Sequence, residues 1–240
     1  MSSIDVNNVL ELQYLYFDPD SLSGDMRDRY EVVKSKYNIN IKNKTKYNVE
    51  KQIMVNKLKK GVYDELSFAW KNGLIKSDNI IEKDGEYYKM CYGGKVSVAS
   101  LKNYINNISN NKAKILELIR SKVDEDGWEK VYCLAKEDAP SGVGPVNIIN
   151  ALFFISKGMA PIYDKYVHKA IRALAMNITP DCVYIGENPD KDDVRRVLIM
   201  YKEYMLLLKK IFPDECEKKD EFISRELDRA LWVYGHYNEK

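Results

Sequence analysis

Asp164 is the residue of this chain whose position most suggests a role in chemistry. It follows a short segment that contains a proline, and a glycine turn lies twenty positions before it. The turn is Gly142-Val143-Gly144, and Pro145 comes directly after it. Glycine allows backbone angles and close approaches that other residues do not, and proline suits the first turn of a helix. The free amides of such a turn bind phosphate oxygens. The spacing therefore predicts a phosphate-binding turn that acts together with a carboxylate.

Two roles are open for Asp164. Aspartate is among the best residues for capping a helix N-terminus, and a helix is expected from this point to about residue 175. A capped carboxylate is also held rigidly and kept ionised, which is what stabilisation of a developing positive charge requires. The capping role and a catalytic role are therefore compatible.

The stretch from Ala139 to Leu174 resembles the helix-hairpin-helix signature of DNA base-excision glycosylases, the superfamily that includes the 8-oxoguanine DNA glycosylases. Gly142-Val143-Gly144 is similar to the hairpin, the apolar segment after it to the second helix, and Pro161-Ile162-Tyr163-Asp164 to the loop with the catalytic aspartate. Ser141 departs from the family pattern, which has proline directly before the first glycine. The resemblance implies a mainly α-helical glycosylase fold.

For the reaction, the resemblance implies that Asp164 stabilises the sugar cation while the N-glycosidic bond breaks. The backbone amides of Gly142, Gly144 and Val146 would hold the DNA backbone, with Lys165 as a further phosphate contact. Bifunctional members carry a lysine where this chain has Val146, and valine cannot form a Schiff base. The resemblance therefore implies a monofunctional, water-using enzyme that requires no metal and accepts a monovalent cation at the hairpin carbonyls.

The base itself must leave the DNA stack to be reached, and an aromatic pocket would receive it. Tyr163, Tyr166 and Trp232 are the predicted stacking residues, and Asp228 is a further pocket candidate. The final segment also has an ordinary interpretation, since Leu227, Leu231 and Tyr234 are spaced as a core stripe on a helix. Both interpretations stay open. His168 shares a helical face with Asp164 and is expected on the helix surface.

Composition neither demands nor excludes a nucleic-acid partner, because 240 residues carry a net charge of only +2. Residues 42–60 hold seven lysines against one acid, a local excess that suits phosphates but also suits a solvated surface. Four scattered cysteines predict neither disulfides nor a metal cluster. No apolar run is long enough to cross a membrane and no export signal is evident, so the cytoplasm is the expected location.

Helical periodicity dominates the chain, and a turn signal at Lys83-Asp84-Gly85 predicts one β-hairpin within residues 80–98. We expect a single helix-hairpin-helix glycosylase-like domain over 1–240, monomeric, with one lobe at 1–110 plus 186–240 and another at 111–185. The predicted helices are 5–14, 26–37, 47–73 with a break near Gly61, 97–107, 111–122, 126–136, 145–157, 164–175, 190–211 and 219–235.

The sequence thus predicts a DNA glycosylase that acts on double-stranded DNA containing a modified base. Three alternatives remain open. A non-catalytic nucleic-acid-binding module would use the same hairpin and would keep Asp164 only as a cap. A glycosidase of this fold would act on a modified nucleoside, which the low net charge allows. A defence enzyme would remove modified viral bases by the same chemistry. The identity of the base is not encoded in any motif of the chain.

Overall fold

The structure is a computed structural model, and it describes residues 4–37, 39, 41, 44–73, 97–121, 125–216 and 222–237, with Glu125 and Asp126 described by their backbone alone. Helices dominate this part of the chain, as predicted. The one β pairing among the described residues is an isolated parallel bridge between Phe17 and Thr45. Of the predicted β-hairpin at 80–98, only residues 97 and 98 are described. Cys91 lies outside the described residues.

The chain folds into two compact units, each built from separate stretches of sequence. Unit 1 consists of Met1–Glu50, Tyr163–Glu187 and Glu203–Lys240, and unit 2 consists of Lys51–Ile162 and Asn188–Lys202. These bounds differ from those of the two lobes expected from the sequence. Whether the whole chain acts as a single domain stays a prediction.

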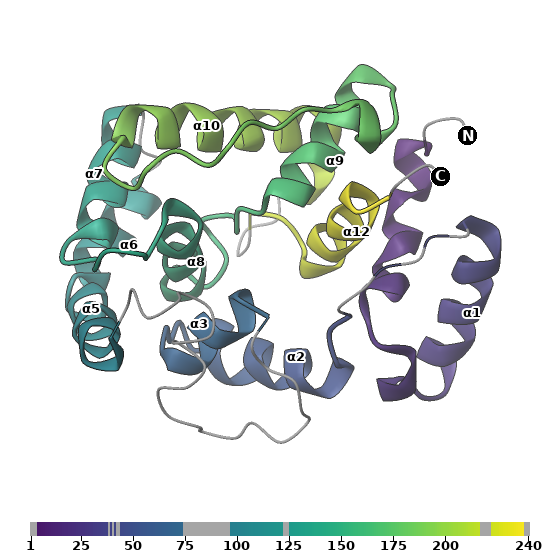
Figure 1. Cartoon of the computed structure of the whole chain (residues 1–240), viewed down its shortest axis with the longest axis horizontal. Helices are drawn as coiled ribbons and strands as arrows, with labels where there is room; N and C mark the ends of the chain where they lie inside the picture. The colour runs from purple at the N-terminus through teal and green to yellow at the C-terminus, as the bar shows by residue number, and fades with distance from the viewer. Residues whose placement is uncertain are drawn as a thin grey trace. The chain divides into compact units, whose positions relative to one another are not determined.

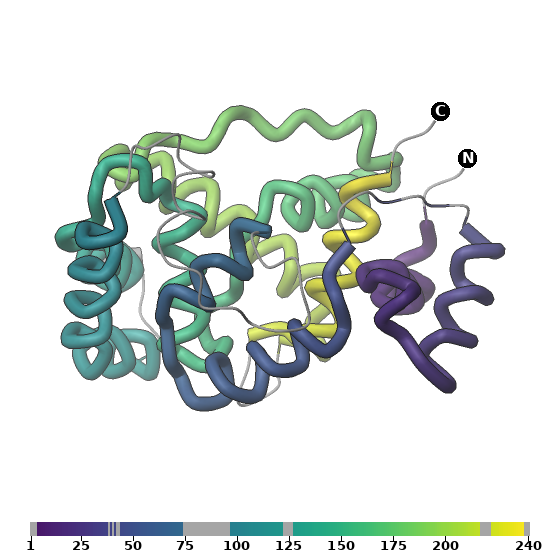
Figure 2. Tube along the Cα trace, turned by 60° about the horizontal axis from the view of Figure 1, so that its bottom comes forward, coloured from purple at the N-terminus to yellow at the C-terminus, as the bar shows by residue number. Residues whose placement is uncertain are grey.

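Unit 1 is organised around its last helix. Helix α12 packs against both the N-terminal 3₁₀ segment η1 and helix α9, and Figures 1 and 2 show α12 in yellow beside α9 in green. The elements of unit 1 are η1 (Val6–Tyr16), η2 (Pro19–Ser21), α1 (Asp25–Tyr37), α9 (Lys165–Met176), η4 (Pro180–Cys182), α11 (Pro213–Cys216) and α12 (Arg225–Gly235), with the first part of α2 (Tyr47–Ile53) and the second part of α10 (Val194–Ile211).

The spacing of apolar residues explains why the first element is a 3₁₀ helix rather than the predicted α-helix. Val9, Leu12 and Leu15 recur every third residue, and all three are fully buried. A 3₁₀ helix has three residues per turn, so this spacing places them on one face. Asp5 caps the segment by accepting a hydrogen bond from the amide of Asn7 at 2.9 Å.

Unit 2 is built around helix α8 (Pro145–Ile155). Ten of its eleven residues are buried, and the exception is Val146. Helices α3 and α7 and the π-helical turn η3 pack against α8. A helix with apolar residues all around it is buried all around, and α8 fits this description apart from the buried Asn147 and Asn150, which makes it the core of the unit. The elements of unit 2 are η3 (Met54–Leu58), α3 (Glu65–Lys71), α5 (Val98–Asn110), α6 (Lys112–Arg120), α7 (Glu125–Lys136) and α8 (Pro145–Ile155), with the remainders of α2 and α10.

Most predicted helices are confirmed, with differences at their ends. The segment expected at 47–73 is interrupted near Gly61, as predicted, because Gly61 has a positive φ of 64° and Asp64 caps a new helix. Helix α10 ends at Ile211, just before Pro213. None of the described helices is long and apolar enough to cross a membrane.

Candidate functional site

Asp164 is the N-cap of helix α9, as its sequence context predicts. Its backbone is extended (φ −142°, ψ 137°), and its side-chain oxygen Oδ1 accepts a hydrogen bond from the amide of Tyr166 at 2.8 Å. Its carbonyl oxygen accepts a bond from the amide of His168 at 2.9 Å, which starts the helix. The side chain is half-buried. The carboxylate is therefore fixed in one orientation at the positive end of a helix of twelve residues.

Three aromatic rings form a cluster where α9 and α12 meet. Tyr166, Trp232 and His236 make up this aromatic cluster. The rings of Tyr166 and His236 are stacked, with centroids 3.5 Å apart and an interplanar angle of 26°. The ring centroids of Trp232 and His236 lie 3.9 Å apart at an interplanar angle of 44°, and those of Tyr16 and Trp232 lie 5.2 Å apart in a T-shaped arrangement. Two predicted pocket residues, Tyr166 and Trp232, are thus brought together by a histidine.

Gly235 explains how α12 comes so close to the start of α9. A Cβ atom placed on Gly235 would lie 2.6 Å from the carbonyl carbon and 3.0 Å from the Cα of Tyr166. Ordinary van der Waals contact begins near 3.4 Å, so only glycine fits. The close approach of the backbones puts the next residue, His236, directly over the ring of Tyr166.

No sequence pattern singles out His236, because the ring on which it stacks, Tyr166, lies seventy positions earlier in the chain. Its Nδ1 lies 2.8 Å from the carbonyl oxygen of Trp232. Burial lowers the pKa of His236, and the cations of Lys165 and Lys169 lower it further, while the Trp232 carbonyl and the Asp164 carboxylate oppose the shift. The imidazole is therefore neutral at neutral pH, and it interacts electrostatically with Asp164.

Tyr163 lies in the core of unit 1, with no exposed surface, and so offers no ring face for stacking in this structure. Its hydroxyl lies within hydrogen-bond distance of Nδ1 of His168, at 2.9 Å, and burial raises the pKa of Tyr163, so the hydroxyl keeps its proton. The prediction that His168 lies on the helix surface is wrong, since its exposure is 2%. The bond to Tyr163 satisfies Nδ1 in the interior, and burial lowers the pKa of His168 to about 4.

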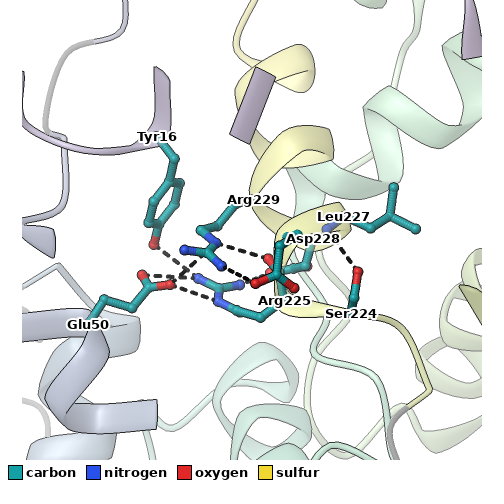
Figure 3. A network of polar contacts seen from close by, with 8 residues as sticks. Tyr16, Glu50, Ser224, Arg225, Leu227, Asp228 and Arg229 are labelled. Atoms are coloured by element: carbon teal, nitrogen blue, oxygen red, sulfur yellow. Dashed lines mark hydrogen bonds and ion pairs between the residues drawn. The ribbon is translucent and has the colours of Figure 1, made fainter. Parts of the chain in front are cut away.

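Asp228 belongs to a buried network of ion pairs (Figure 3). Its Oδ2 pairs with Nη1 of Arg225. The same guanidinium binds Glu50 through Nε at 3.1 Å and the hydroxyl of Tyr16 through Nη2 at 3.1 Å. Arg229 lies 3.7 Å from Glu50. Asp228 thus serves mainly to hold the fold through its ion pair with Arg225. Its other oxygen, Oδ1, is buried without a hydrogen-bond partner in the described part of the chain.

The core interpretation of the last helix is confirmed for its apolar stripe. Leu227 and Leu231 are fully buried, and Tyr234 is 1% exposed. Trp232 lies on a different side of the helix and is half-buried. The segment therefore provides both a core face and one edge of the aromatic cluster.

The glycine turn of unit 2 has the backbone geometry that its sequence predicts. Gly142 has a φ of 93°, which favours glycine, and Gly144 is the N-cap of α8 with φ −82° and ψ 173°. The amide of Val143 donates to the carbonyl of Pro140 at 3.1 Å. Within the described part of the chain, the amides of Gly142, Gly144 and Val146 have no hydrogen-bond acceptor. These three amides are therefore free to bind an anion.

Lys191 holds the start of this turn from a distant part of the sequence. Its ammonium binds the carbonyl oxygen of Ala139 and lies 3.4 Å from that of Pro140. Positive charge is thus already present at two carbonyls of the loop where a monovalent cation was expected. No group of three or more metal-ligating side chains occurs among the described residues. Cys133, Cys182 and Cys216 are free thiols.

Of the basic residues, Lys165 is exposed and its ammonium lies 5.0 Å from the ring centroid of Tyr166. The lysine run of residues 42–60 crosses the boundary between the units, and Lys57 pairs with Asp64. Asp164 belongs to unit 1 and the glycine turn to unit 2. A single site that contains both stays a prediction.

No family model matches the chain, and no curated protein or solved structure matches it significantly.

Proposed function

We propose that this protein is a monofunctional DNA glycosylase of helix-hairpin-helix fold that hydrolyses the N-glycosidic bond of a damaged or modified base in double-stranded DNA. One observation carries the proposal: a half-buried carboxylate, Asp164, is fixed at the start of α9 next to the aromatic cluster of Tyr166, Trp232 and His236. Cleavage of this bond builds positive charge on the sugar, and a fixed carboxylate stabilises that charge. Aromatic rings are suited to a base that has left the stack.

The residue types of unit 2 support the same proposal. The free amides of Gly142, Gly144 and Val146 would bind phosphate oxygens, and exposed Lys165 of unit 1 would add a cation. Val146 supplies no amine for a Schiff base, so water is the expected nucleophile. We further propose that the protein is a monomeric enzyme of base-excision repair in the cytoplasm. It would need no metal and would accept a monovalent cation at the hairpin.

A panel of substrates tests the activity. Duplexes that carry 8-oxoguanine, uracil, an alkylated base or a hypermodified cytosine are incubated with the protein and scored for strand breaks with and without alkali. Breaks that need alkali support a monofunctional glycosylase, and breaks without alkali would mean that a lysine acts as the nucleophile. The corresponding free nucleosides form a parallel arm, and their exclusive cleavage would reassign the substrate from DNA to nucleosides.

Asp164→Asn tests the residue on which the proposal rests. Asparagine is also a good N-cap, so α9 keeps its start while the negative charge is lost. We expect base release to disappear and affinity for the duplex to stay unchanged. Asp5→Asn is the matched control, because Asp5 also caps a helix by accepting from the amide two residues later. If Asp164→Asn retained the rate of Asp5→Asn, the proposal would be refuted.

A non-catalytic DNA-binding module is the second candidate function. It is favoured by one contact, because the capping bond from Tyr166 to Asp164 gives that carboxylate a structural role without any chemistry. Such a module would bind duplex DNA through the glycine turn and release no base from any substrate of the panel. Retention of duplexes by the parent protein in a gel-shift assay, without base release, would select this candidate.

A further inference from the structure

The imidazole of His236 is held in one orientation and one tautomer. A carbonyl oxygen only accepts hydrogen bonds, so the 2.8 Å contact with the Trp232 carbonyl requires the proton on Nδ1. The ring is stacked on Tyr166 with centroids 3.5 Å apart, which fixes the plane of the imidazole, and the contact with the Trp232 carbonyl selects its orientation in that plane. Nε2 is therefore the nitrogen with the lone pair.

Nε2 of His236 is open to a small ligand. No residue in the described part of the chain forms a hydrogen bond with Nε2. Several side-chain atoms in the described part of the chain are fully buried and lack a hydrogen-bond partner, and Nε2 of His236 is not one of them. The side chain is half-buried, so a water molecule can reach the nitrogen. The atom is thus a fixed and unused hydrogen-bond acceptor.

The charges around His236 suit a group that gains a proton and then loses it. Burial lowers the pKa, and Lys165 and Lys169 act in the same direction, so the ring starts neutral. Asp164 acts in the opposite direction, since its carboxylate favours an imidazolium. The Asp164 carboxylate therefore stabilises the imidazolium that forms when the neutral ring takes up a proton.

We propose that His236 is the general base of the reaction, which takes a proton from the attacking water while Asp164 stabilises the positive charge. This inference rests on the proposed glycosylase function. The water oxygen bonds to C1′ of the sugar as the C1′–N bond breaks, and the bonding electrons leave with the base. The proton of the water moves to Nε2 and then to a nitrogen of the departing base, which restores the neutral imidazole.

His236→Asn tests this role, because the asparagine amide still donates to the Trp232 carbonyl while the basic nitrogen is lost. At protein concentrations that saturate the duplex, we expect single-turnover base release to fall on the order of 100-fold, as for loss of a general base. A rate equal to that of the parent protein would overturn the inference, and loss of activity in Asp164→Asn in the same assay would leave the proposed function intact. If the parent protein released no base, both would be overturned.

The pH profile separates a base from a residue that only shapes the fold. The parent rate should rise with pH through a limb below pH 6.5, where the imidazole loses its proton, and then reach a plateau. His236→Asn should lack this limb. Lys169→Gln removes a cation that disfavours the imidazolium, so it should move the limb to higher pH. A limb that persists in His236→Asn would overturn the assignment.

Nitrogen NMR gives a readout that needs no substrate. The chain contains only two histidines, so labelled imidazole signals are assigned by replacing one of them. We expect His236 to carry its proton on Nδ1 at neutral pH and to show a lower pKa in Asp164→Asn, because the carboxylate that favours the imidazolium is gone. An Nε2-protonated tautomer, or a titration unaffected by Asp164→Asn, would refute the proposed pairing.

Discussion

Replacing Gly235 by alanine tests whether the contact between α9 and α12 depends on the missing side chain. The added Cβ would lie 2.6 Å from the carbonyl carbon of Tyr166, whereas ordinary contact begins near 3.4 Å. The carbonyl oxygen of Tyr166 would lie closer still to the added Cβ, so the two backbones must separate by more than about 1 Å, which is a severe form of overpacking. Because His236 follows Gly235 directly, the same separation pulls its ring away from Tyr166.

The expected magnitude comes from two opposing effects. Alanine at a helical position stabilises the folded state by about 1 kcal/mol relative to glycine. Overpacking against a backbone costs about 3 kcal/mol, at the upper end of the usual range, because the carbonyl of Tyr166 cannot rotate away as a side chain does. We expect a net loss of about 2 kcal/mol in the free energy of unfolding, which lowers Tm by about 4–8 °C for a chain of this size.

Thermal and urea unfolding of Gly235→Ala measure this loss. Gly186→Ala is the matched control, because Gly186 also lies in unit 1 and a Cβ there meets its nearest atom only at 4.0 Å. Gly186→Ala should unfold within about 0.5 kcal/mol of the parent protein, as surface substitutions usually do. A Gly235→Ala protein as stable as this control would refute the proposed role of Gly235.

Three further perturbations probe other contacts. Glu50→Gln removes the carboxylate that two buried guanidiniums share, so it should lower the free energy of unfolding in urea by about 3 kcal/mol; the same midpoint as the parent would contradict this. The pKa of His168 is about 4 in the folded protein, against an ordinary value of 6.5. The folded state therefore loses about 3 kcal/mol of its free energy of unfolding as the pH drops from 6.5 toward 4. His168→Gln should reduce this pH dependence in acid unfolding curves. Lys191→Met removes the ammonium from the Ala139 and Pro140 carbonyls, so amide hydrogen exchange should accelerate in residues 139–144; unchanged exchange would assign the turn's rigidity to other contacts.

Local sequence signals were enough to predict the helices and the cap at Asp164. A cap requires only an aspartate, the amide two residues later and an apolar pattern behind it, all of which lie in one short stretch. The glycine turn is equally local, and its positive φ at Gly142 follows from residue type. The 3₁₀ form of residues 6–16 was missed, although the three-residue spacing of Val9, Leu12 and Leu15 was visible in the sequence.

Contacts between distant segments were beyond the sequence. The ring of His236 meets Tyr166, seventy positions earlier, only because the backbones touch at Gly235. His168 was expected on the surface and lies in the core, where its partner Tyr163 is only five positions away, because burial depends on what packs against the helix and not on the local sequence. Glu50 and Arg225 lie 175 positions apart, and nothing in the sequence around either residue signals the other.

The arrangement of unit 1 has a consequence for synthesis on the ribosome. The apolar face of η1 is made long before its partner α12. At about 5–20 residues per second, the ribosome needs on the order of 10–40 s to produce the roughly 200 residues between them. Val9, Leu12 and Leu15 therefore stay without the helix that packs against them throughout this interval, so the apolar face of the nascent η1 segment is exposed to other proteins until α12 has been made.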